Sequence, residues 1–229
     1  MNRLTRVQIA ARVAQDIEDG LVVNLGIGMP ELVADQIPEN REIIFHSENG
    51  VLGLGPKPND DEIDPDLINA GKKPVTIVSG ASFFHQADSF AMIRGGHIDL
   101  SILGAFQVSV EGDLANWATS DLKSAPSVGG AMDLAIGAKK IFVMMQHCSS
   151  NGEPKLVDEC TYPLTGSGVV KRIYTDIAVI EIGDFGFIAI EVIKGLGETE
   201  LSEITGAQIQ FADDWRVLRP KLGYTERFK

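Results

Sequence analysis

The segment Ser47-Glu48-Asn49-Gly50 places a carboxylate directly after an apolar run that predicts a β-strand. In an open α/β sheet, ligands bind at the carboxyl ends of the strands. Gly50 and Gly53 follow the carboxylate and let a substrate approach the backbone closely. Glu48 is therefore a candidate functional carboxylate at a ligand-binding edge of the sheet. The alternative interpretation of Glu48 is a solvated surface charge.

A glycine loop at residues 24–30, with the sequence NLGIGMP, lies between a predicted strand and a predicted helix. It begins like a dinucleotide-binding fingerprint, but Glu31 stands where the third glycine belongs, which argues against NAD binding. The amides of such a turn can still hold an anion. The alternative is a tight turn that needs glycine for steric reasons alone. The sequence contains no P-loop motif and no GxSxG nucleophile elbow.

Composition excludes several classes of partner. The chain has 229 residues, 44% of them hydrophobic, and 20 Lys and Arg against 32 Asp and Glu give a net charge of −12. This charge argues against nucleic-acid binding and against an anionic membrane surface. Only Cys148 and Cys160 are present, without the spacing of a zinc site, so we expect reduced thiols and no metal. The apolar runs of about five to seven residues are too short to span a bilayer, and we expect a cytoplasmic protein.

The apolar pattern predicts short strands that alternate with helices. Helices are predicted at residues 5–18, with Thr5 and Gln8 as a capping box, and after Pro30, near residues 89–94 and at residues 130–138. Strands are predicted at residues 21–25, 42–46, 75–79, 100–103 and 140–145, and a loop is predicted to run on through residue 73. Residues 173–182 and 187–192 form a predicted hairpin.

This order of elements predicts one α/β domain. The expected fold is an open, mainly parallel sheet with helices on both faces and an antiparallel terminal hairpin. We place the domain at residues 1–210 and treat residues 211–229 as a C-terminal tail of unknown role.

Several segments together resemble family I CoA-transferases, in their B (β) subunit. The active-site signature is matched by Ser47-Glu48-Asn49-Gly50 and the GLGP sequence at residues 53–56. Further matches, in the same order along the chain, are residues 23–28, 88–97, 103–108, 112–117, 129–134, 160–166 and 173–176. The resemblance extends over about residues 4–210 and implies the CoA-transferase fold.

The resemblance implies a mechanism and a catalytic residue. In this family a glutamate attacks an acyl-CoA thioester, an acyl-glutamyl anhydride forms, and CoA then returns to give a glutamyl-CoA thioester that a second acid takes over. The match assigns the role of this glutamate to Glu48. No cofactor is implied, because the CoA thioester is itself a substrate.

Other matched positions suggest supporting residues. An oxyanion or CoA-pocket role is expected for Gly129, Gly130, Asn24, Asn49, Gly26, Gly28 and Gly53. For the glycine pair Gly129-Gly130, a helix-capping turn is the alternative. Lys72 is the candidate for contacting a CoA phosphate, although a solvated lysine or a substitution by Lys73 remains open. His85 is a candidate for holding a carboxylate of the acceptor acid.

The substrates and the partner also follow from the resemblance. Among family variants, the chain looks closest to those that transfer CoA from succinyl-CoA to 3-oxoadipate, in aromatic degradation. The segments that suggest this are residues 45–48, 83–85, 103–107 and 125–130. Acetoacetate and short-chain fatty acids are the alternative acceptors, and a non-catalytic CoA-binding or structural chain is a further alternative. The family requires an A (α) subunit, commonly in an A2B2 assembly, so we expect the isolated chain to be inactive or nearly so.

Overall fold

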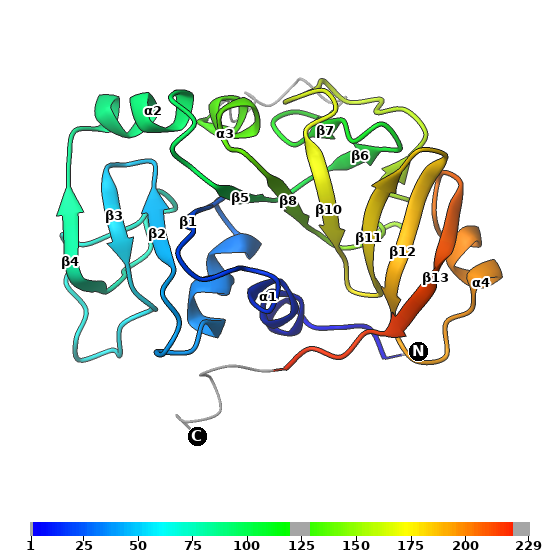
Figure 1. Ribbon diagram of the computed structural model, residues 1–229, viewed down its shortest axis with the longest axis horizontal. Helices are drawn as coiled ribbons and strands as arrows, with labels where there is room; N and C mark the ends of the chain where they lie inside the picture. The colour runs from blue at the N-terminus through cyan, green and yellow to red at the C-terminus, as the bar shows by residue number, and fades with distance from the viewer. Residues whose placement is uncertain (1, 120–128, 222–229) are drawn as a thin grey trace.

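The computed structural model describes residues 2–119 and 129–221, and a ten-stranded sheet runs through the whole molecule (Figure 1). The order of its strands is β13-β12-β11-β10-β8-β5-β1-β2-β3-β4. In chain order these strands are β1 (Val22–Leu25), β2 (Ile44–Ser47), β3 (Val51–Leu54), β4 (Ile77–Phe83), β5 (Leu100–Leu103), β8 (Ile141–Met144), β10 (Val170–Tyr174), β11 (Ala178–Gly183), β12 (Gly186–Val192) and β13 (Ile209–Val217).

The centre of the sheet is parallel, and both of its sides carry antiparallel additions. The mutually parallel strands are β2, β1, β5, β8 and β10. The chain places β2 on one side of β1 and returns with β5 on the other side, so the strand order reverses at β1. In open α/β sheets, the crevice at such a reversal, outside the carboxyl ends, is where ligands bind.

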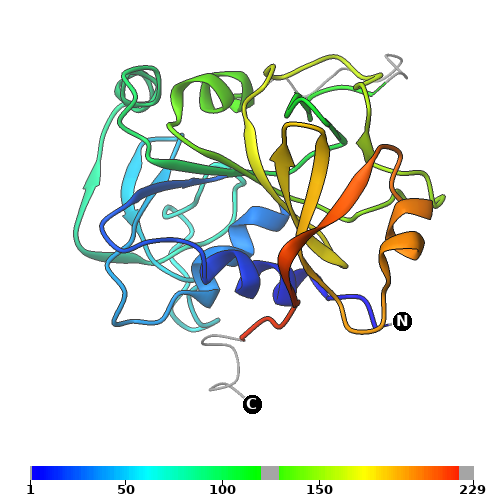
Figure 2. The ribbon, with the colours of Figure 1, turned by 45° about the vertical axis from the view of Figure 1, so that its right-hand side comes forward.

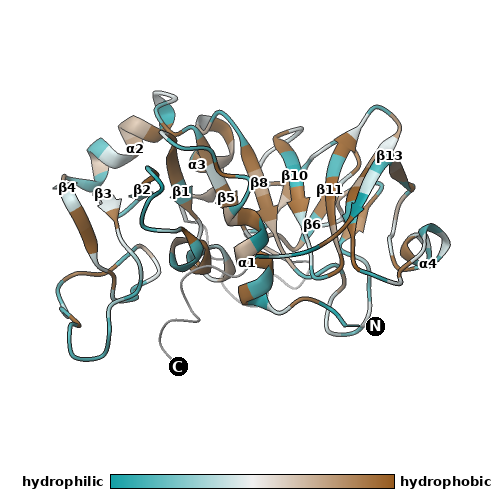
Figure 3. Ribbon diagram, turned by 60° about the horizontal axis from the view of Figure 1, so that its bottom comes forward, coloured by the Kyte–Doolittle hydropathy of each residue, from teal (hydrophilic) through white to brown (hydrophobic). Residues whose placement is uncertain are grey.

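Helices cover both faces of this parallel centre (Figures 1 and 2). Helix α1 (Arg6–Ala14) and the 3₁₀ helix η1 (Met29–Gln36) pack together on one face, and α2 (Gln86–Arg94) and α3 (Ala131–Gly137) pack together on the other. As a result β5 and β8 are buried along their whole length, and Figure 3 shows the hydrophobic residues gathered on the central strands. No helix within the described residues combines the length and apolar character needed to cross a bilayer.

The remaining elements are one helix and a small separate sheet. Helix α4 (Glu198–Glu203) contacts β13. A separate three-stranded sheet has the order β7-β6-β9 and consists of β6 (Gln107–Ser109), β7 (Leu114–Ala115) and β9 (Leu156–Val157).

The start of helix α1 is confirmed, because the residues that determine it all lie within that helix and its cap. The Thr5 side chain accepts from the Gln8 amide and the Gln8 side chain accepts from the Thr5 amide, which completes the predicted capping box. Helix α1 ends at Ala14 rather than near residue 18. Beyond this end, Asp16 accepts hydrogen bonds from Arg172 and Tyr174 on β10, a contact that the helical pattern does not encode.

Three predictions about elements were wrong. The predicted loop through residue 73 contains β3, whose short apolar run is interrupted by Gly53. The predicted strand at residues 173–182 is two strands, because the chain turns at residues 175–177 and β11 returns antiparallel to β10.

The third correction concerns the C-terminal tail. The boundary at residue 210 falls inside β13, which pairs in parallel with β12, so residues 211–217 belong to the sheet. As an edge strand, β13 leaves Asp213 and Asp214 exposed, and the alternation expected of a buried strand is absent.

Candidate active site

A tight hairpin between β2 and β3 presents Glu48. The loop consists of Glu48, Asn49 and Gly50, and the Gly50 amide closes it by donating to the Ser47 carbonyl oxygen at 3.0 Å. Gly50 has a φ of 112°, and a Cβ there would lie 2.1 Å from the carbonyl oxygen of Phe84. Only glycine fits this position, so the glycine of the motif fixes the turn that projects the glutamate.

The Glu48 carboxylate faces the beginning of α3. A Cβ on Gly130, the N-cap residue of α3, would lie 2.3 Å from Glu48 Oε2 and 2.9 Å from Phe90 Cζ. Any side chain at residue 130 would therefore collide with the carboxylate or displace it. Gly130 is buried and Gly129 is exposed, so the fold brings one member of the predicted glycine pair against the predicted nucleophile.

Electrostatics leave the Glu48 carboxylate poorly stabilised. Burial raises its pKa above the ordinary value, and the nearby negative charge of Asp133 raises it further. Within the described residues no hydrogen bond or ion pair to this carboxylate exists, and a half-buried anion in that condition is unusual. Such an unpartnered carboxylate is available to react with a bound electrophile.

Asn24 lies beneath the turn in a buried polar row. Its Nδ2 is 3.0 Å from His46 Nδ1, and His46 Nε2 is 2.9 Å from Ser89 Oγ on α2. Burial lowers the pKa of His46 to about 4, so its ring is neutral at pH 7. Asn24 therefore lies at the carboxyl end of β1 as predicted, but its amide group is held by a histidine rather than directed at Glu48.

The backbone amides of Gly26 and Gly28, in the first glycine loop, both form hydrogen bonds within the chain. The Gly26 amide donates to the Ile102 carbonyl oxygen at 2.8 Å, and this joins the ends of β1 and β5. Gly28 has a φ of 96°, and its amide donates to Glu31 Oε2 at 2.8 Å. Since both amides are engaged, a role for them in holding an anion stays a prediction.

At Gly53 the backbone of β3 lies very close to the backbone of β4. It has a φ of 90°, and a Cβ there would lie 3.0 Å from the Cα of Ala81 on β4. The β3–β4 register is irregular at this point. Gly53 thus allows β4 to pack against β3 next to the Glu48 turn, and its predicted pocket role is not tested by this geometry.

The long loop of residues 56–74 is tied back onto the active-site turn. Asn49 Nδ2 donates to the Ile68 carbonyl oxygen at 2.9 Å, and the Ala70 amide donates to Ser47 Oγ at 3.0 Å. Asn49 therefore uses its amide group to hold the loop, and its expected oxyanion or CoA-pocket role stays a prediction.

The two lysines of this loop differ in their partners. Lys73 Nζ forms an ion pair with Glu31 Oε2 at 2.6 Å, so it is committed within the chain. Lys72 is exposed and adopts a left-handed backbone with a φ of 62°, the one non-glycine residue among those described to do so. Within the described residues the Lys72 side chain forms no hydrogen bond or ion pair, so of the two lysines it is the one available to meet an incoming phosphate.

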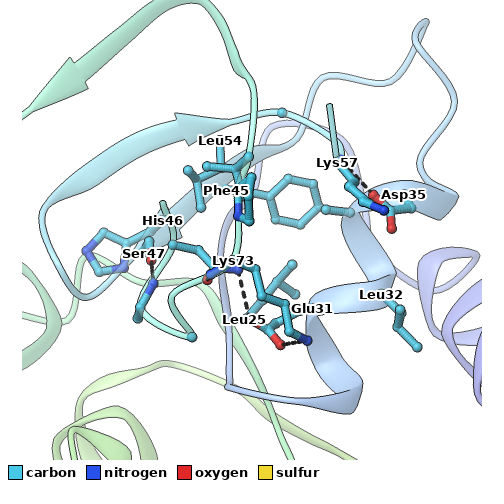
Figure 4. A pocket seen from close by; sticks show the side chains of 17 residues that line it. Leu25, Glu31, Leu32, Asp35, Phe45, His46, Ser47, Leu54, Lys57 and Lys73 are labelled. Carbon is cyan, nitrogen blue, oxygen red and sulfur yellow. Dashed lines mark hydrogen bonds and ion pairs between the residues drawn. The ribbon is translucent and has the colours of Figure 1, made fainter. Parts of the chain in front are cut away.

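A cavity of about 310 Å³ lies beside the strand that leads to Glu48 (Figure 4). Its walls are mainly apolar and include Leu25, Leu32, Phe45 and Leu54. The ion pair of Glu31 with Lys73 stands at one side of it (Figure 4). The cavity can hold an apolar group, and the 56–74 loop forms part of its lining.

Comparison with known proteins decides the family. Residues 6–194 match the coenzyme A transferase family. The chain belongs to this family.

Individual CoA-transferases are similar over almost the whole chain. The B subunit of the 3-oxoadipate CoA-transferase of Pseudomonas putida is 55% identical over 207 residues, which is 90% of this chain and 97% of that protein. The B subunit of the succinyl-CoA:3-ketoacid coenzyme A transferase of Helicobacter pylori is 50% identical over 205 residues, which is 90% of this chain and 98% of that protein.

Solved structures confirm the predicted fold. The acyl-CoA transferase apoenzyme of Escherichia coli O157:H7 matches with a TM-score of 0.75 at 16% identity, over 95% of this chain. The match covers 44% of that longer protein, so this chain corresponds to less than half of it.

In this CoA-transferase chain, His85 has a local structural role that the sequence analysis missed. It is the N-cap of α2, and its Nδ1 accepts from the Ala87 amide at 3.1 Å. The side chain is exposed, and Nε2 has no partner within the described residues. A contact with the acceptor acid stays a prediction.

Sequence reasoning missed three residues that shape this CoA-transferase site: His46, Ser89 and Asp133. A signal for His46 was available, because it ends the predicted strand only two residues before Glu48. Ser89 and Asp133 carried no such signal, since helices from distant parts of the chain bring them to the site. Of the segments that suggested 3-oxoadipate, residues 125–128 lie outside the described residues.

Proposed function

We propose that this chain is the B (β) subunit of a CoA-transferase that moves CoA from succinyl-CoA to a 3-oxo acid, with 3-oxoadipate as the preferred acceptor. Glu48 is the nucleophile, and the reaction passes through a glutamyl-CoA thioester. The observation that carries the proposal is the half-buried Glu48 carboxylate, which faces Gly130 and has no hydrogen-bond partner within the described residues.

The chemistry needs a carboxylate and no base. Glu48 attacks the thioester carbonyl carbon of succinyl-CoA, the C–S bond breaks, and an acyl-glutamyl anhydride and CoA thiolate result. The thiolate then attacks the glutamyl carbonyl, and succinate leaves as a carboxylate. The acceptor carboxylate attacks the glutamyl-CoA thioester, and the same two steps in reverse release the new acyl-CoA and restore Glu48. No net proton transfer occurs, and one thioester replaces another.

Each attack develops negative charge on a carbonyl oxygen. Backbone amides that already point at such an oxygen contribute about 3–4 kcal/mol to the transition state in other enzymes. The position of Gly130 against Glu48 supports an oxyanion or CoA-pocket role for Gly129 and Gly130. The free, exposed Lys72 supports a contact with a phosphate of CoA, while Lys73 is held by Glu31.

The choice of acceptor rests on the relatives. The chain is 55% identical to the B subunit of a 3-oxoadipate CoA-transferase and 50% identical to that of a succinyl-CoA:3-ketoacid transferase. The higher identity favours 3-oxoadipate, and the second relative keeps acetoacetate as the alternative. His85 is the candidate for holding the distal carboxylate that 3-oxoadipate has and acetoacetate lacks.

The partner is an A (α) subunit. Both relatives are named as B subunits, and the solved acyl-CoA transferase has more than twice the length that this chain matches. We propose an A2B2 complex in the cytoplasm, with the site completed by the A subunit.

The test is to co-express the chain with its A subunit and to mix the complex with succinyl-CoA. Intact-mass spectrometry of both polypeptides is expected to show a CoA adduct on this chain. Glu48→Ala is expected to abolish the adduct, and 3-oxoadipate is expected to discharge it faster than acetoacetate.

Each other outcome has a defined meaning. Discharge by acetoacetate alone would keep the mechanism and correct the acceptor. A folded complex that forms no adduct with succinyl-CoA, acetoacetyl-CoA or butyryl-CoA would overturn the transferase mechanism and leave a CoA-binding or structural chain.

A further inference from the structure

A row of polar side chains crosses three central strands directly below the Glu48 turn. His46 on β2, Asn24 on β1 and Ser101 on β5 are register partners, and each is 1% exposed or less. Register partners on neighbouring strands point to the same face of the sheet. Because buried polar groups destabilise a protein unless they are hydrogen-bonded, the arrangement of this row requires an explanation.

The hydrogen bonds define which nitrogen of His46 carries the proton. Asn24 Nδ2 donates to the His46 carbonyl oxygen at 3.3 Å and also lies 3.0 Å from His46 Nδ1. A carbonyl oxygen only accepts, so the NH₂ group of Asn24 faces His46 and Nδ1 must be an unprotonated acceptor. The ring proton is therefore on Nε2, which donates to Ser89 Oγ at 2.9 Å.

Asn24 is held from one side only. Its Oδ1 is buried and has no hydrogen-bond partner within the described residues, and the same is true of Ser101 Oγ. The orientation of the Asn24 amide group therefore depends on His46, which engages the NH₂ group through both its ring and its backbone.

His46 also connects two elements that meet near the Glu48 carboxylate. It lies two residues before Glu48, and its partner Ser89 is adjacent to Phe90 on α2. Phe90 in turn approaches the same point at Gly130 that Glu48 Oε2 approaches. The ring of His46 thus links β2, which leads to Glu48, to α2, which carries Phe90.

We propose that His46 is a positioning residue for the Glu48 carboxylate: its ring holds Asn24, whose amide group ties β1 to the backbone of β2 two residues before Glu48, and it holds Ser89 on α2. This inference rests on the proposed function of Glu48. Through Nδ1 the ring fixes the amide group of Asn24, and through Nε2–H it fixes the spacing of β2 and α2. His46 contacts no substrate and exchanges no proton in the reaction.

Two substitutions separate the two halves of this role. In His46→Asn the side-chain oxygen can replace Nδ1 as the acceptor for Asn24, whereas the donor to Ser89 is lost. In His46→Gln the amide nitrogen can replace Nε2–H as the donor to Ser89, whereas the acceptor for Asn24 is lost. In the complex with the A subunit, each is expected to slow CoA-adduct formation from succinyl-CoA by about 10- to 100-fold, with KM changed less than about twofold.

Double variants identify the hydrogen bond that each change removes. Adding Ser89→Ala to His46→Asn is expected to slow the reaction no further, because the bond to Ser89 is already absent. Adding Ser89→Ala to His46→Gln is expected to slow it again. The opposite pattern would overturn the assignment of Nε2–H to Ser89.

His147 provides a matched control. It is equally buried, its Nε2 lies 2.9 Å from Thr205 Oγ1, and burial lowers its pKa to about 4 as well. It follows β8, which is separated from β2 by β5 and β1. His147→Asn and His147→Gln are expected to lower the melting temperature and leave the rate of adduct formation unchanged. If the His46 variants behave in the same way, His46 is only structural and the proposal is overturned.

A measurement independent of activity separates this inference from the proposed function. The chain has four histidines, so ¹⁵N-histidine NMR of the complex can resolve the His46 ring. We expect a neutral ring with its proton on Nε2 at pH 7, and a proton on Nδ1 or a charged ring would contradict the inference. A wild-type complex that forms no adduct would overturn the proposed function, and with it the role of His46 in the reaction, whatever the NMR result.

Discussion

Glu48 has a carboxylate whose ionisation the protein disfavours, although the proposed reaction needs the ionised form. Burial is the larger cause of its raised pKa and Asp133 the smaller one. An anion that neither water nor hydrogen bonds fully stabilise is a more reactive nucleophile than a solvated one. The lack of a hydrogen-bond partner for Glu48 within the described residues therefore agrees with its proposed role.

Asp133 offers a way to change this pKa without touching the nucleophile. The rate of adduct formation should fall as pH decreases through the pKa of Glu48, and this fall should occur above the pH typical of a glutamate. Asp133→Asn removes a negative charge, so it is expected to lower that pKa and move the fall to lower pH. The measurement is the rate of adduct formation in the complex between pH 4 and 7.

Arg94→Gln is the matched opposite of this variant. Arg94 forms an ion pair with Asp133 at 2.6 Å, so its loss leaves the charge of Asp133 less compensated. The fall in rate should then move to higher pH. Shifts in the same direction for Asp133→Asn and Arg94→Gln would contradict the account.

The sequence revealed only part of this site. Glu48 could be predicted because one continuous motif carries it. The contact of Gly130 with Glu48 could not, since it depends on how α3 packs over the sheet, and a buried histidine such as His46 looks like any core residue until its partners are seen.

At the scale of elements, the turn at residues 69–73 combines backbone strain with a free charge. The Lys72 amide donates to the Asn69 carbonyl oxygen at 2.9 Å, and Lys72 adopts a left-handed backbone. A non-glycine residue in this conformation costs about 1 kcal/mol or more. Within the described residues the Lys72 side chain forms no hydrogen bond or ion pair that would offset this cost, which agrees with a functional use.

Lys72→Gly separates the strain from the charge. Glycine adopts the left-handed conformation readily, so the melting temperature is expected to stay the same or rise. The KM for succinyl-CoA is expected to increase several-fold if the ammonium group binds a phosphate, with kcat little changed. Lys72→Arg keeps the charge and should keep the KM. An unchanged KM in Lys72→Gly would exclude Lys72 as a phosphate contact.

Elements could be predicted where a local signal was sufficient. The capping box at Thr5 and the apolar run of β5 are examples. β13 escaped prediction because it is an exposed edge strand. β11 escaped prediction because the turn at residues 175–177 contains neither glycine nor proline: Thr175 Oγ1 closes it by accepting from the Ile177 and Ala178 amides, and Asp176 accepts from the His147 amide at 2.7 Å.

At the scale of the whole molecule, two buried histidines link stability to pH. Burial lowers the pKa of both His46 and His147 to about 4, against about 6.5 in the unfolded chain. Above pH 6.5 both histidines are neutral in the folded and in the unfolded chain, so their protonation costs the folded chain no stability. As pH falls from 6.5 to 4 the unfolded chain binds protons that the folded chain does not, so about 3 kcal/mol of stability per histidine is expected to be lost.

Urea unfolding at several pH values checks this expectation. The free energy of unfolding should decrease between pH 6.5 and 4, and His147→Asn should show a shallower decrease from a lower starting value at pH 7. An equal slope in the variant and the wild type would contradict the assignment of His147.

The C-terminal strand is a second whole-molecule feature. Ile209 and Leu218 are each 5% exposed, and β13 protects the edge of β12. Ending the chain at Gln208 is expected to lower stability by about 3 kcal/mol or more and to promote aggregation through the exposed edge. The full-length chain is the reference for the melting temperature. Equal stability of the shorter chain would contradict the assignment of residues 209–218 to the domain.

The central claim is that CoA becomes attached to Glu48, and the most direct test locates the bond. The complex is mixed with succinyl-CoA and treated with borohydride, which reduces a side-chain thioester to a primary alcohol, and the peptides are then sequenced by mass spectrometry. We expect the alcohol at Glu48, in a peptide that the Glu48→Ala variant leaves unmodified. Reduction at Glu31, at Asp133 or in the A subunit, with Glu48 intact, would contradict the account.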